Sequence, residues 1–290
     1  MAVVGHVGEV WRYPVKSMGG ERLVQSSLGQ RGVAGDRGWA LRDEQAGEIR
    51  GAKKLPDLLR CVARYLSEPT EDTVPPAEIT LPDGTQIHSD DPAVAGRLSE
   101  LLGRRVTMWP LQPASATEHY RRAAPDNPDM LVELREIFGR TADEPLPDLS
   151  VFPPEIMEYT SPRGTYFDAF PLHLLTTASL AALGARTPSA RFDVRRFRPN
   201  VLVETAGGTG LVETEWLGQM LRIGSARIKI EVPCVRCVMT TLPQGDLVKD
   251  SSVLRTIVRD AAQNLGVYAT VVSPGRVAVG DAVELIEPAT

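Results

Sequence analysis

The chain has 290 residues, of which 42% are hydrophobic and 24% are charged, with a formal net charge of -5. This composition is typical of a globular protein of one or two domains and excludes a disordered or fibrous chain. The acidic balance argues against a general nucleic-acid binder, which needs surplus Lys and Arg for phosphate contacts. Charged residues early in the chain and the lack of any run of about 20 apolar residues predict no signal peptide and no membrane span, so we expect a cytoplasmic protein.

The first part of the chain is predicted to be mostly β, because apolar and polar residues alternate along it. The expected strands are residues 7–13, 21–27 and 36–41, and two short strands within 78–88. A turn at Met18, Gly19 and Gly20 joins the first two into a hairpin. Apolar residues at helical spacing over 93–102, followed by Gly103, predict one helix. We therefore expect a first domain over residues 1–110.

Residues 111–162 are rich in proline, aspartate and glutamate, which predicts a long connection. One short helix is expected within it, at residues 130–138.

The last part, residues 163–290, is again predicted to be mainly β. The expected strands are residues 166–176, 200–204, 216–223, 227–232, 267–272 and 277–285. Two helices are expected, one over 177–183 that ends at Gly184 and one over 252–265 that is capped by Asp250 or Ser251 and ends at Gly266. The fold class is therefore predicted as mostly β with some helices, α+β.

The three cysteines, Cys61, Cys234 and Cys237, are too few for a disulfide framework. A Cys-x-x-Cys pair is half of a zinc site, a dithiol redox couple, a source of one thiolate for a soft metal, or simply two buried thiols. No second paired spacing supplies the other zinc ligands. The β-branched residues after Cys237 argue against the helix of a thioredoxin-like couple. The pattern alone leaves the remaining alternatives open.

Basic residues crowd together at Arg191, Arg195, Arg196 and Arg198 in this acidic chain, which indicates an anionic ligand or neutralising carboxylates. Asn200 follows and can both donate and accept hydrogen bonds, as recognition of a heterocycle requires. Lys16 and Ser17 lie at the predicted hairpin turn, where amides and a hydroxyl can hold a phosphate oxygen.

Four sequence blocks carry a family resemblance. They are residues 11–17 (WRYPVKS), 35–39 (GDRGW), 197–200 (FRPN) and 233–237 (PCVRC), the last followed by Thr240 and Thr241. In this order they resemble the MOSC (molybdenum cofactor sulfurase C-terminal) family, in particular members with an N-terminal MOSC β-barrel domain, such as the mitochondrial amidoxime-reducing component and bacterial relatives. The resemblance implies an N-terminal barrel-like domain over 1–110, a connection over 111–162 and a C-terminal MOSC β-barrel over 163–290.

The resemblance also implies a pocket for the molybdenum cofactor, a pyranopterin dithiolene with a terminal phosphate. Cys237 would ligate molybdenum and Cys234 would be a neighbour, while Asp168 would have a catalytic, proton-handling role. We expect Arg236 to line the site and to activate the adjacent thiol. The residues implied to hold the phosphate and pterin are Lys16, Ser17, Arg37, Arg198 and Asn200, of which Arg37 is reached only through the family. Ala169 stands where the family often has a hydroxyl residue.

The implied activity is the reduction of small N-hydroxylated compounds by a molybdenum-dependent oxidoreductase. Because the chain lacks a set of four cysteines for an iron-sulfur cluster, we expect electrons from a separate donor protein. Two alternatives remain: a sulfur carrier with a persulfide on Cys237, and a non-enzymatic protein that binds the cofactor or another anionic ligand.

Overall fold

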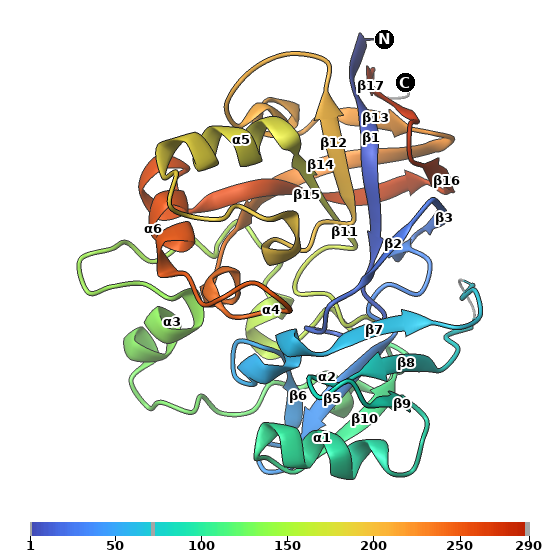
Figure 1. Cartoon of the computed structure of the whole chain (residues 1–290), viewed down its shortest axis with the longest axis vertical. Helices are drawn as coiled ribbons and strands as arrows, with labels where there is room; N and C mark the ends of the chain where they lie inside the picture. Colours follow the sequence, from blue (N-terminus) through green and yellow to red (C-terminus); the bar gives the residue numbers. More distant parts are fainter. Residues whose placement is uncertain (1, 71–72, 288–290) are drawn as a thin grey trace.

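The computed structural model describes residues 2–70 and 73–287 and has a closed seven-stranded barrel as its centre (Figure 1). The strand order is β12-β11-β15-β14-β13-β17-β1, and β1 pairs back onto β12 to close the barrel. The bounds are β1 (Ala2–Arg12), β11 (Leu172–Thr176), β12 (Val201–Thr205), β13 (Met220–Ile223), β14 (Ala226–Val235), β15 (Asn264–Ser273) and β17 (Ala282–Ile286). The predicted mostly β fold class is thus confirmed.

Alternating side chains build the barrel core. Along β14, Ala226, Ile228 and Ile230 are fully buried, whereas the intervening Arg227 and Lys229 are exposed. This period of two lets one face of each strand fill the interior while the other meets solvent. The buried residues of β1 and β12 join the same core, so the N-terminal strand belongs to a barrel that is otherwise built from residues after 171.

Three small sheets lie outside the barrel. They are β10-β5-β6, with β5 (Trp39–Asp43), β6 (Glu48–Arg50) and β10 (Val106–Pro110); β7-β8-β9, with β7 (Val62–Tyr65), β8 (Ala77–Thr80) and β9 (Gln86–His88); and β16-β3-β4, with β3 (Gln25–Gly29), β4 (Gly32–Val33) and β16 (Gly275–Ala278). The short β2 (Glu21–Leu23) pairs with β1. The first two sheets, η1 (Pro56–Arg60) and α1 (Val94–Leu102) enclose a second core below the barrel (Figure 1).

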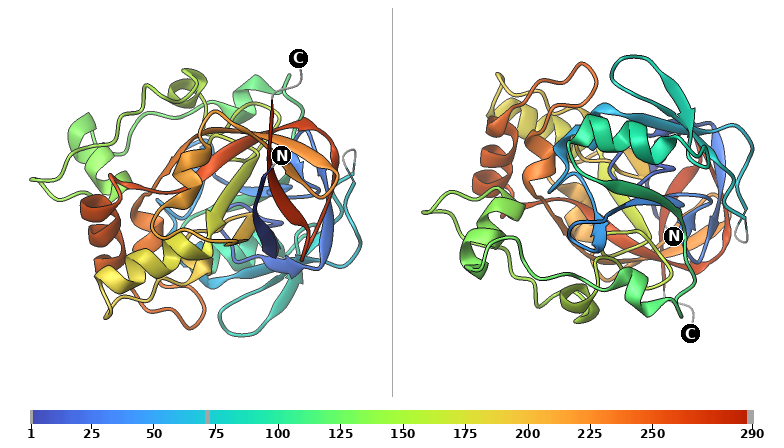
Figure 2. Two further views of the ribbon diagram at one scale, coloured as in Figure 1. Left: turned by 90° about the horizontal axis from the view of Figure 1, so that it is seen from above. Right: turned by 90° about the horizontal axis from the view of Figure 1, so that it is seen from below.

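The connection carries three helices, α2 (Thr117–Tyr120), α3 (Met130–Phe138) and α4 (Glu155–Glu158). The bounds predicted for α3 are correct: Asp129 accepts hydrogen bonds from the amides of Leu131 and Val132, and Gly139 ends the helix with a φ of 61°. The connection runs along the outside of the molecule beside the barrel and the small sheets (Figure 2).

Helices α5 (Thr177–Arg186) and α6 (Ser251–Asp260) pack together against the outside of the barrel, over a third core (Figure 1). Short 3-10 helices lie at η2 (Val194–Arg196), η3 (Val212–Trp216) and η4 (Val238–Thr241). Asp250 caps α6, as predicted, by accepting a hydrogen bond from the amide of Ser252. Gly184 does not end the preceding helix, because α5 continues to Arg186.

Several predicted boundaries in the last part are wrong. The helix expected over 252–265 ends at Asp260, since the following residues pair with β11 and β14 as β15. Only β11 of the strand expected over 166–176 forms, and the segment before it bends towards Lys16 instead. The region 277–285 makes two strands, because β16 pairs with β3 while β17 pairs with β1 and β13. Pairing partners distant in sequence decide these boundaries.

None of the helices in the described part of the chain combines the length and the apolar character that crossing a membrane requires.

We predict that Gly266→Ala destabilises the protein by about 2–4 kcal/mol. Gly266 has a φ of +81°, and an added Cβ would lie 2.3 Å from His173 Nε2 and 2.6 Å from the carbonyl oxygen of Leu174. The matched control is Gly96→Ala within α1, where nothing lies within 4 Å of the added atom, and it should gain about 0.5–1 kcal/mol. Urea unfolding of both variants measures the difference, and equal stabilities would contradict this account.

Candidate functional site

All the residues that the sequence predicts for the site line one cavity, which has a volume of about 160 Å³. Those residues are Lys16, Ser17, Arg37, Asp168, Arg198, Asn200, Arg236 and Cys237. They come from the loops that follow β1 and β14 and from the loops that precede β5, β11 and β12. Lys16 and Cys237, which are more than 200 positions apart in the sequence, therefore line the same cavity.

A buried carboxylate, Asp36, joins three of the sequence blocks. Its Oδ1 accepts a hydrogen bond from the backbone amide of Tyr13 at 2.8 Å, and its Oδ2 accepts one from Asn200 Nδ2 at 2.9 Å. Asp36 also forms an ion pair with Arg37. The Asn200 Oδ1 in turn accepts the amide of His173 at 3.1 Å. Both ends of the Asn200 amide are thus used inside the protein, so Asn200 positions the cavity wall instead of offering a free edge to a heterocycle.

Two arginines of the cavity pack against the Tyr13 ring. The guanidinium carbon of Arg198 lies 4.2 Å from the ring centroid and that of Arg37 lies 4.9 Å from it. Both residues have left-handed backbone conformations, with φ of 55° and 51°, and Ser17 has a φ of 68°. Such conformations are costly for residues with a Cβ and persist where the surrounding structure imposes them. They place the three side chains in the lining of one cavity.

Arg198 and Arg236 are buried cations that lack carboxylate partners among the described residues. Burial, together with the charge of Arg37, lowers the pKa of Arg198 to about 10. Within the described chain, Arg198 Nη2 and Arg236 Nε have no hydrogen-bond partner. Buried donors without partners cost free energy, and an anionic ligand would satisfy them.

Lys16 and Lys53 both form ion pairs with the carboxylate of Asp168. Lys16 Nζ donates to Asp168 Oδ1 and to the carbonyl oxygen of Tyr166, both at 2.8 Å, and Lys53 Nζ lies 3.7 Å from Asp168 Oδ2. Desolvation alone would raise the pKa of Asp168, but Lys16, Lys53 and Arg37 outweigh it and hold that pKa well below its ordinary value. Asp168 is therefore an ionised counter-ion at neutral pH, a charge state that does not suit the proton donor expected from the sequence.

Ser17 has its hydroxyl engaged within the protein as well. Its Oγ accepts the backbone amide of Ala52 at 2.9 Å and thereby ties the loop after β1 to the segment after β6. The contribution of Ser17 to the cavity is the position of that loop.

Cys237 borders the cavity and is partly exposed, whereas Cys234 is buried. Arg236 lines the cavity, and its guanidinium donates from Nη1 to Cys234 Sγ at 2.7 Å and from Nη2 to Phe197 O at 2.7 Å. Burial raises the pKa of Cys234, which suits a neutral neighbour. The residues after Cys237, expected to resist helix formation, form η4.

Two further buried arginines hold the Cys237 loop from both sides. Arg140 Nη2 donates to the carbonyl oxygen of Arg236 at 3.0 Å, and Arg196 Nη1 donates to that of Thr240 at 3.3 Å. Within the described residues neither has a carboxylate partner: Arg196 donates to backbone carbonyls alone, and Arg140 donates to backbone carbonyls and to the side-chain amide oxygen of Gln263. Both therefore act as positioning residues for the thiol.

The donor set fits the molybdenum cofactor better than a zinc ion. The described residues contain no group of three or more His, Cys, Asp or Glu side chains that could hold a metal, which argues against the zinc alternative. A single cavity thiol suits a metal that arrives with its own sulfur ligands, and the unpartnered guanidinium groups suit its terminal phosphate.

Sequence reasoning missed several residues in and around this cavity. Lys53 lines the cavity but lies outside the four sequence blocks. Tyr13 and Asp36 lie within the blocks and carry no signal of their own, and Arg140 comes from the connection; these three support the lining from behind. Conversely, Arg191 and Arg195 of the basic cluster bind Asp193 and Asp246 outside the cavity. Carboxylates therefore neutralise these two arginines, which is one of the two explanations expected for the basic cluster.

Two family models match the chain: the MOSC N-terminal beta barrel domain over residues 4–96 and the MOSC domain over residues 162–284. The chain is a MOSC domain protein with an N-terminal MOSC beta barrel domain, which confirms the resemblance. It is distantly related to mitochondrial amidoxime reducing component 2 of Rattus norvegicus, with 27% identity over 302 residues, 97% of this chain and 83% of the relative.

Two other known proteins are similar to this chain, one over part of its length and one over nearly all of it. Molybdenum cofactor sulfurase 3 of Aedes aegypti is 36% identical over 91 residues, which are 31% of this chain and 11% of that protein. The solved structure of the YuaD protein from Bacillus subtilis aligns with 97% of this chain and 95% of its own, with a TM-score of 0.43 and 12% identity.

We predict that Asp168→Asn destabilises the protein by about 1 kcal/mol, because it leaves Lys16 buried without its counter-ion; the value is small since the Asp168 side chain is 48% exposed. A depressed pKa in the folded state stabilises the protein above the unfolded pKa. The difference from wild type should therefore stay constant between about pH 7 and about pH 5 and shrink only below about pH 4. Chemical unfolding at several pH values measures it, and a difference that already shrinks near pH 6 would contradict the assignment.

We predict that Arg198→Met leaves the free energy of unfolding of the cofactor-free protein within about 1 kcal/mol of wild type, because relief of the buried charge offsets loss of its hydrogen bond to the Met18 carbonyl and its contact with the Tyr13 ring. The same variant should bind inorganic pyrophosphate at least about tenfold more weakly, as measured by calorimetric titration. The control is Arg195→Met, which removes a guanidinium paired with Asp193 and Asp246 and should bind pyrophosphate like wild type. Equal binding by both variants would remove Arg198 from the anion site.

Proposed function

We propose that this protein is a molybdenum-cofactor-dependent oxidoreductase that reduces N-hydroxylated compounds with electrons from a separate donor protein. The observation that carries the proposal is the single cavity in which a partly exposed thiol, Cys237, meets buried guanidinium groups without anionic partners. The distant relationship with the amidoxime reducing components over nearly the whole chain supports the same activity.

Each group of residues has one task in this proposal. Cys237 would hold the metal through its sulfur, with Arg140 and Arg196 fixing the loop that presents it. Arg37, Arg198 and Arg236 would hold the phosphate, and Asn200 and Ser17 would keep the loops of the cavity in place. When bound, the cofactor supplies the two-electron redox chemistry for cleavage of the N–O bond.

The reaction consumes two electrons and two protons and releases an amine or amidine and one water. Lys16 and Asp168 form a charged pair at the cavity, and Asp168 stays ionised at neutral pH, so its task is to balance the charge of Lys16 and Lys53. The protons would enter from solvent on the exposed side of this pair, where half of the Asp168 side chain is accessible.

One observation favours a second candidate function. The similarity to a molybdenum cofactor sulfurase, although it covers 31% of the chain, is consistent with Cys237 as a carrier of persulfide sulfur. This candidate requires the same exposed thiol but no bound metal and no electron donor.

We predict that Cys237→Ser, produced in a host that supplies the cofactor, loses most of its molybdenum and its reductase activity with a chemical electron donor. The control is Cys61→Ala, which removes a thiol from the second core and should keep the metal while losing about 1 kcal/mol of stability. Elemental analysis and amidoxime reduction measure both properties. A Cys237→Ser variant that keeps its metal and its activity would disprove the assignment of the ligand. Wild-type protein without molybdenum but with a thiol-reducible sulfur adduct on Cys237 would favour the sulfur carrier.

A further inference from the structure

A second cavity, with a volume of about 480 Å³, adjoins the first. The two share part of their lining, including Lys16, Lys53, Phe138, Asp168 and Met239. The two cavities are therefore adjacent, and Met239, two residues after Cys237, lines both of them. The size of the second cavity is within the range of about 300–1,000 Å³ that small-molecule sites occupy.

One face of α3 is turned into this cavity and not into a core. Met130, Leu134, Ile137 and Phe138 follow the spacing of a single helical face, and all four line the cavity. Leu131, on another face of the same helix, is 61% exposed and does not line it. An apolar helix face beside an empty space of this size gains stability only when something apolar fills that space.

Other segments complete the apolar surface opposite α3. Ile156 and Met157 come from α4, and Leu149 comes from the preceding loop. Met157 is 60% exposed and Met130 is 47% exposed, so the cavity opens to solvent between two methionines. Methionine is flexible and polarisable and packs against apolar groups of different shapes. The entrance would thus tolerate variation in an apolar ligand.

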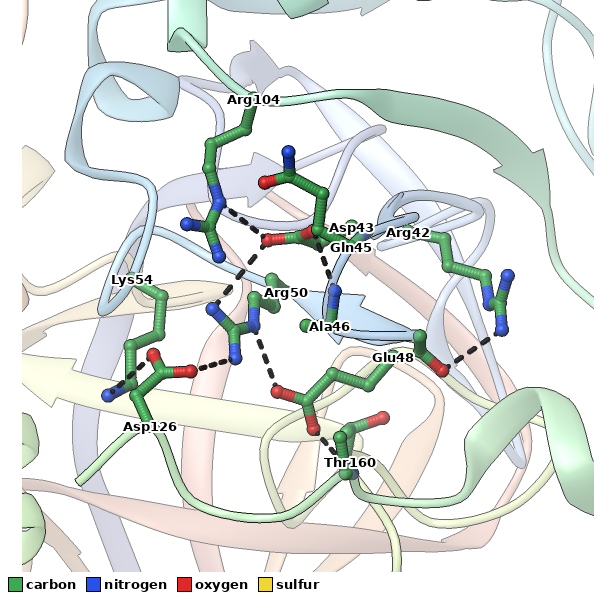
Figure 3. Close-up of polar contacts among 12 residues, drawn as sticks. Arg42, Asp43, Gln45, Ala46, Glu48, Arg50, Lys54, Arg104, Asp126 and Thr160 are labelled. Atoms are coloured by element: carbon green, nitrogen blue, oxygen red, sulfur yellow. Dashed lines mark hydrogen bonds and ion pairs between the residues drawn. The ribbon is translucent and has the colours of Figure 1, made fainter. Parts of the chain in front are cut away.

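The charged wall of the cavity is already neutralised by its own ion pairs (Figure 3). Arg50 lies between Glu48, at 3.0 Å, and Asp126, at 2.5 Å. Lys54 contacts Asp126 at 3.2 Å and Glu133 at 2.6 Å. These pairs also fasten the connection to β6.

The remaining charges of the lining have partners as well. Arg121 pairs with Glu158 at 3.2 Å, and Arg122 donates to the carbonyl oxygens of Ile156 and Tyr159. Arg122 has no carboxylate partner among the described residues, but at the other charged side chains of the lining a charged ligand would have to break an existing pair, whereas an uncharged ligand would not.

We propose that the second cavity binds the uncharged, apolar body of the N-hydroxylated substrate and directs its N-hydroxyl group past Met239 towards Cys237. This inference rests on the proposed function and adds to it the substrate class: compounds with an aromatic or extended aliphatic body are preferred over short or charged ones. Leu134 and Ile137 determine this specificity, because both project from the apolar face of α3.

The test uses an uncharged aryl amidoxime and a short alkyl amidoxime as probes with cofactor-loaded protein. Without an electron donor no turnover occurs, so calorimetric titration gives the dissociation constant directly. Ile137→Asn should weaken binding of the aryl amidoxime about 5–10-fold and raise its KM by the same factor, with kcat unchanged. Leu134→Trp, which narrows the cavity beside α3, should also weaken binding of the aryl amidoxime. The control is Leu131→Asn on the exposed face of α3, which should bind like wild type.

The short alkyl amidoxime separates this inference from the proposed function. Its binding should be weak in wild type and unchanged in every variant. If the protein reduces both probes equally well and the α3 variants do not discriminate, the cavity inference is wrong while the proposed function stands. If no N-hydroxylated compound is reduced, yet the aryl probe still binds in a manner that depends on Ile137, the proposed function is wrong and the ligand class of the cavity is supported.

Discussion

The site depends on the buried carboxylate of Asp36. Asp36 fastens the end of β1 through the amide of Tyr13, the loop before β12 through Asn200, and the left-handed turn at Arg37. These three attachments come from segments that no local sequence preference would bring together. A buried carboxylate with both of its oxygens engaged inside the protein fixes geometry instead of binding ligand. The neighbouring cations are thereby left free to face the cavity.

The cavity concentrates positive charge in a chain that is acidic overall. Arg198 and Arg236 keep unpartnered donors, and Ser17, Arg37 and Arg198 are three of the five non-glycine residues with positive φ in the described chain. Both features oppose folding. Their coincidence at one place is typical of a preorganised binding site, in which the free energy of ligand binding offsets the destabilisation. The isolated fold is therefore less stable than its cores alone would make it.

The sequence allowed prediction where local pattern decides structure. The sequence pattern identified β8, β9 and most barrel strands, and the bounds of α3 are those predicted. The family blocks named residues that the structure gathers around one cavity, although their cofactor roles remain predictions. Long-range pairing could not be read in this way: β15 replaces the end of a predicted helix, and Arg191 and Arg195 turn to Asp193 and Asp246. The cavity beside α3 was equally hidden, because its walls come from three distant segments.

The closure of the barrel by β1 affects how the chain must fold. Val10 pairs with Val201, and Val3 pairs with Glu284, so β1 meets its barrel partners β12 and β17 only after most of the intervening polypeptide has been synthesised. Until then the short pairing with β2 covers only the end of β1, and unpaired strand edges are the condition under which nascent β proteins aggregate or recruit chaperones. Contacts of such long sequence separation also slow folding through the entropy of loop closure. The small sheets and the second core, which lie between these partners along the chain, have that interval in which to assemble first.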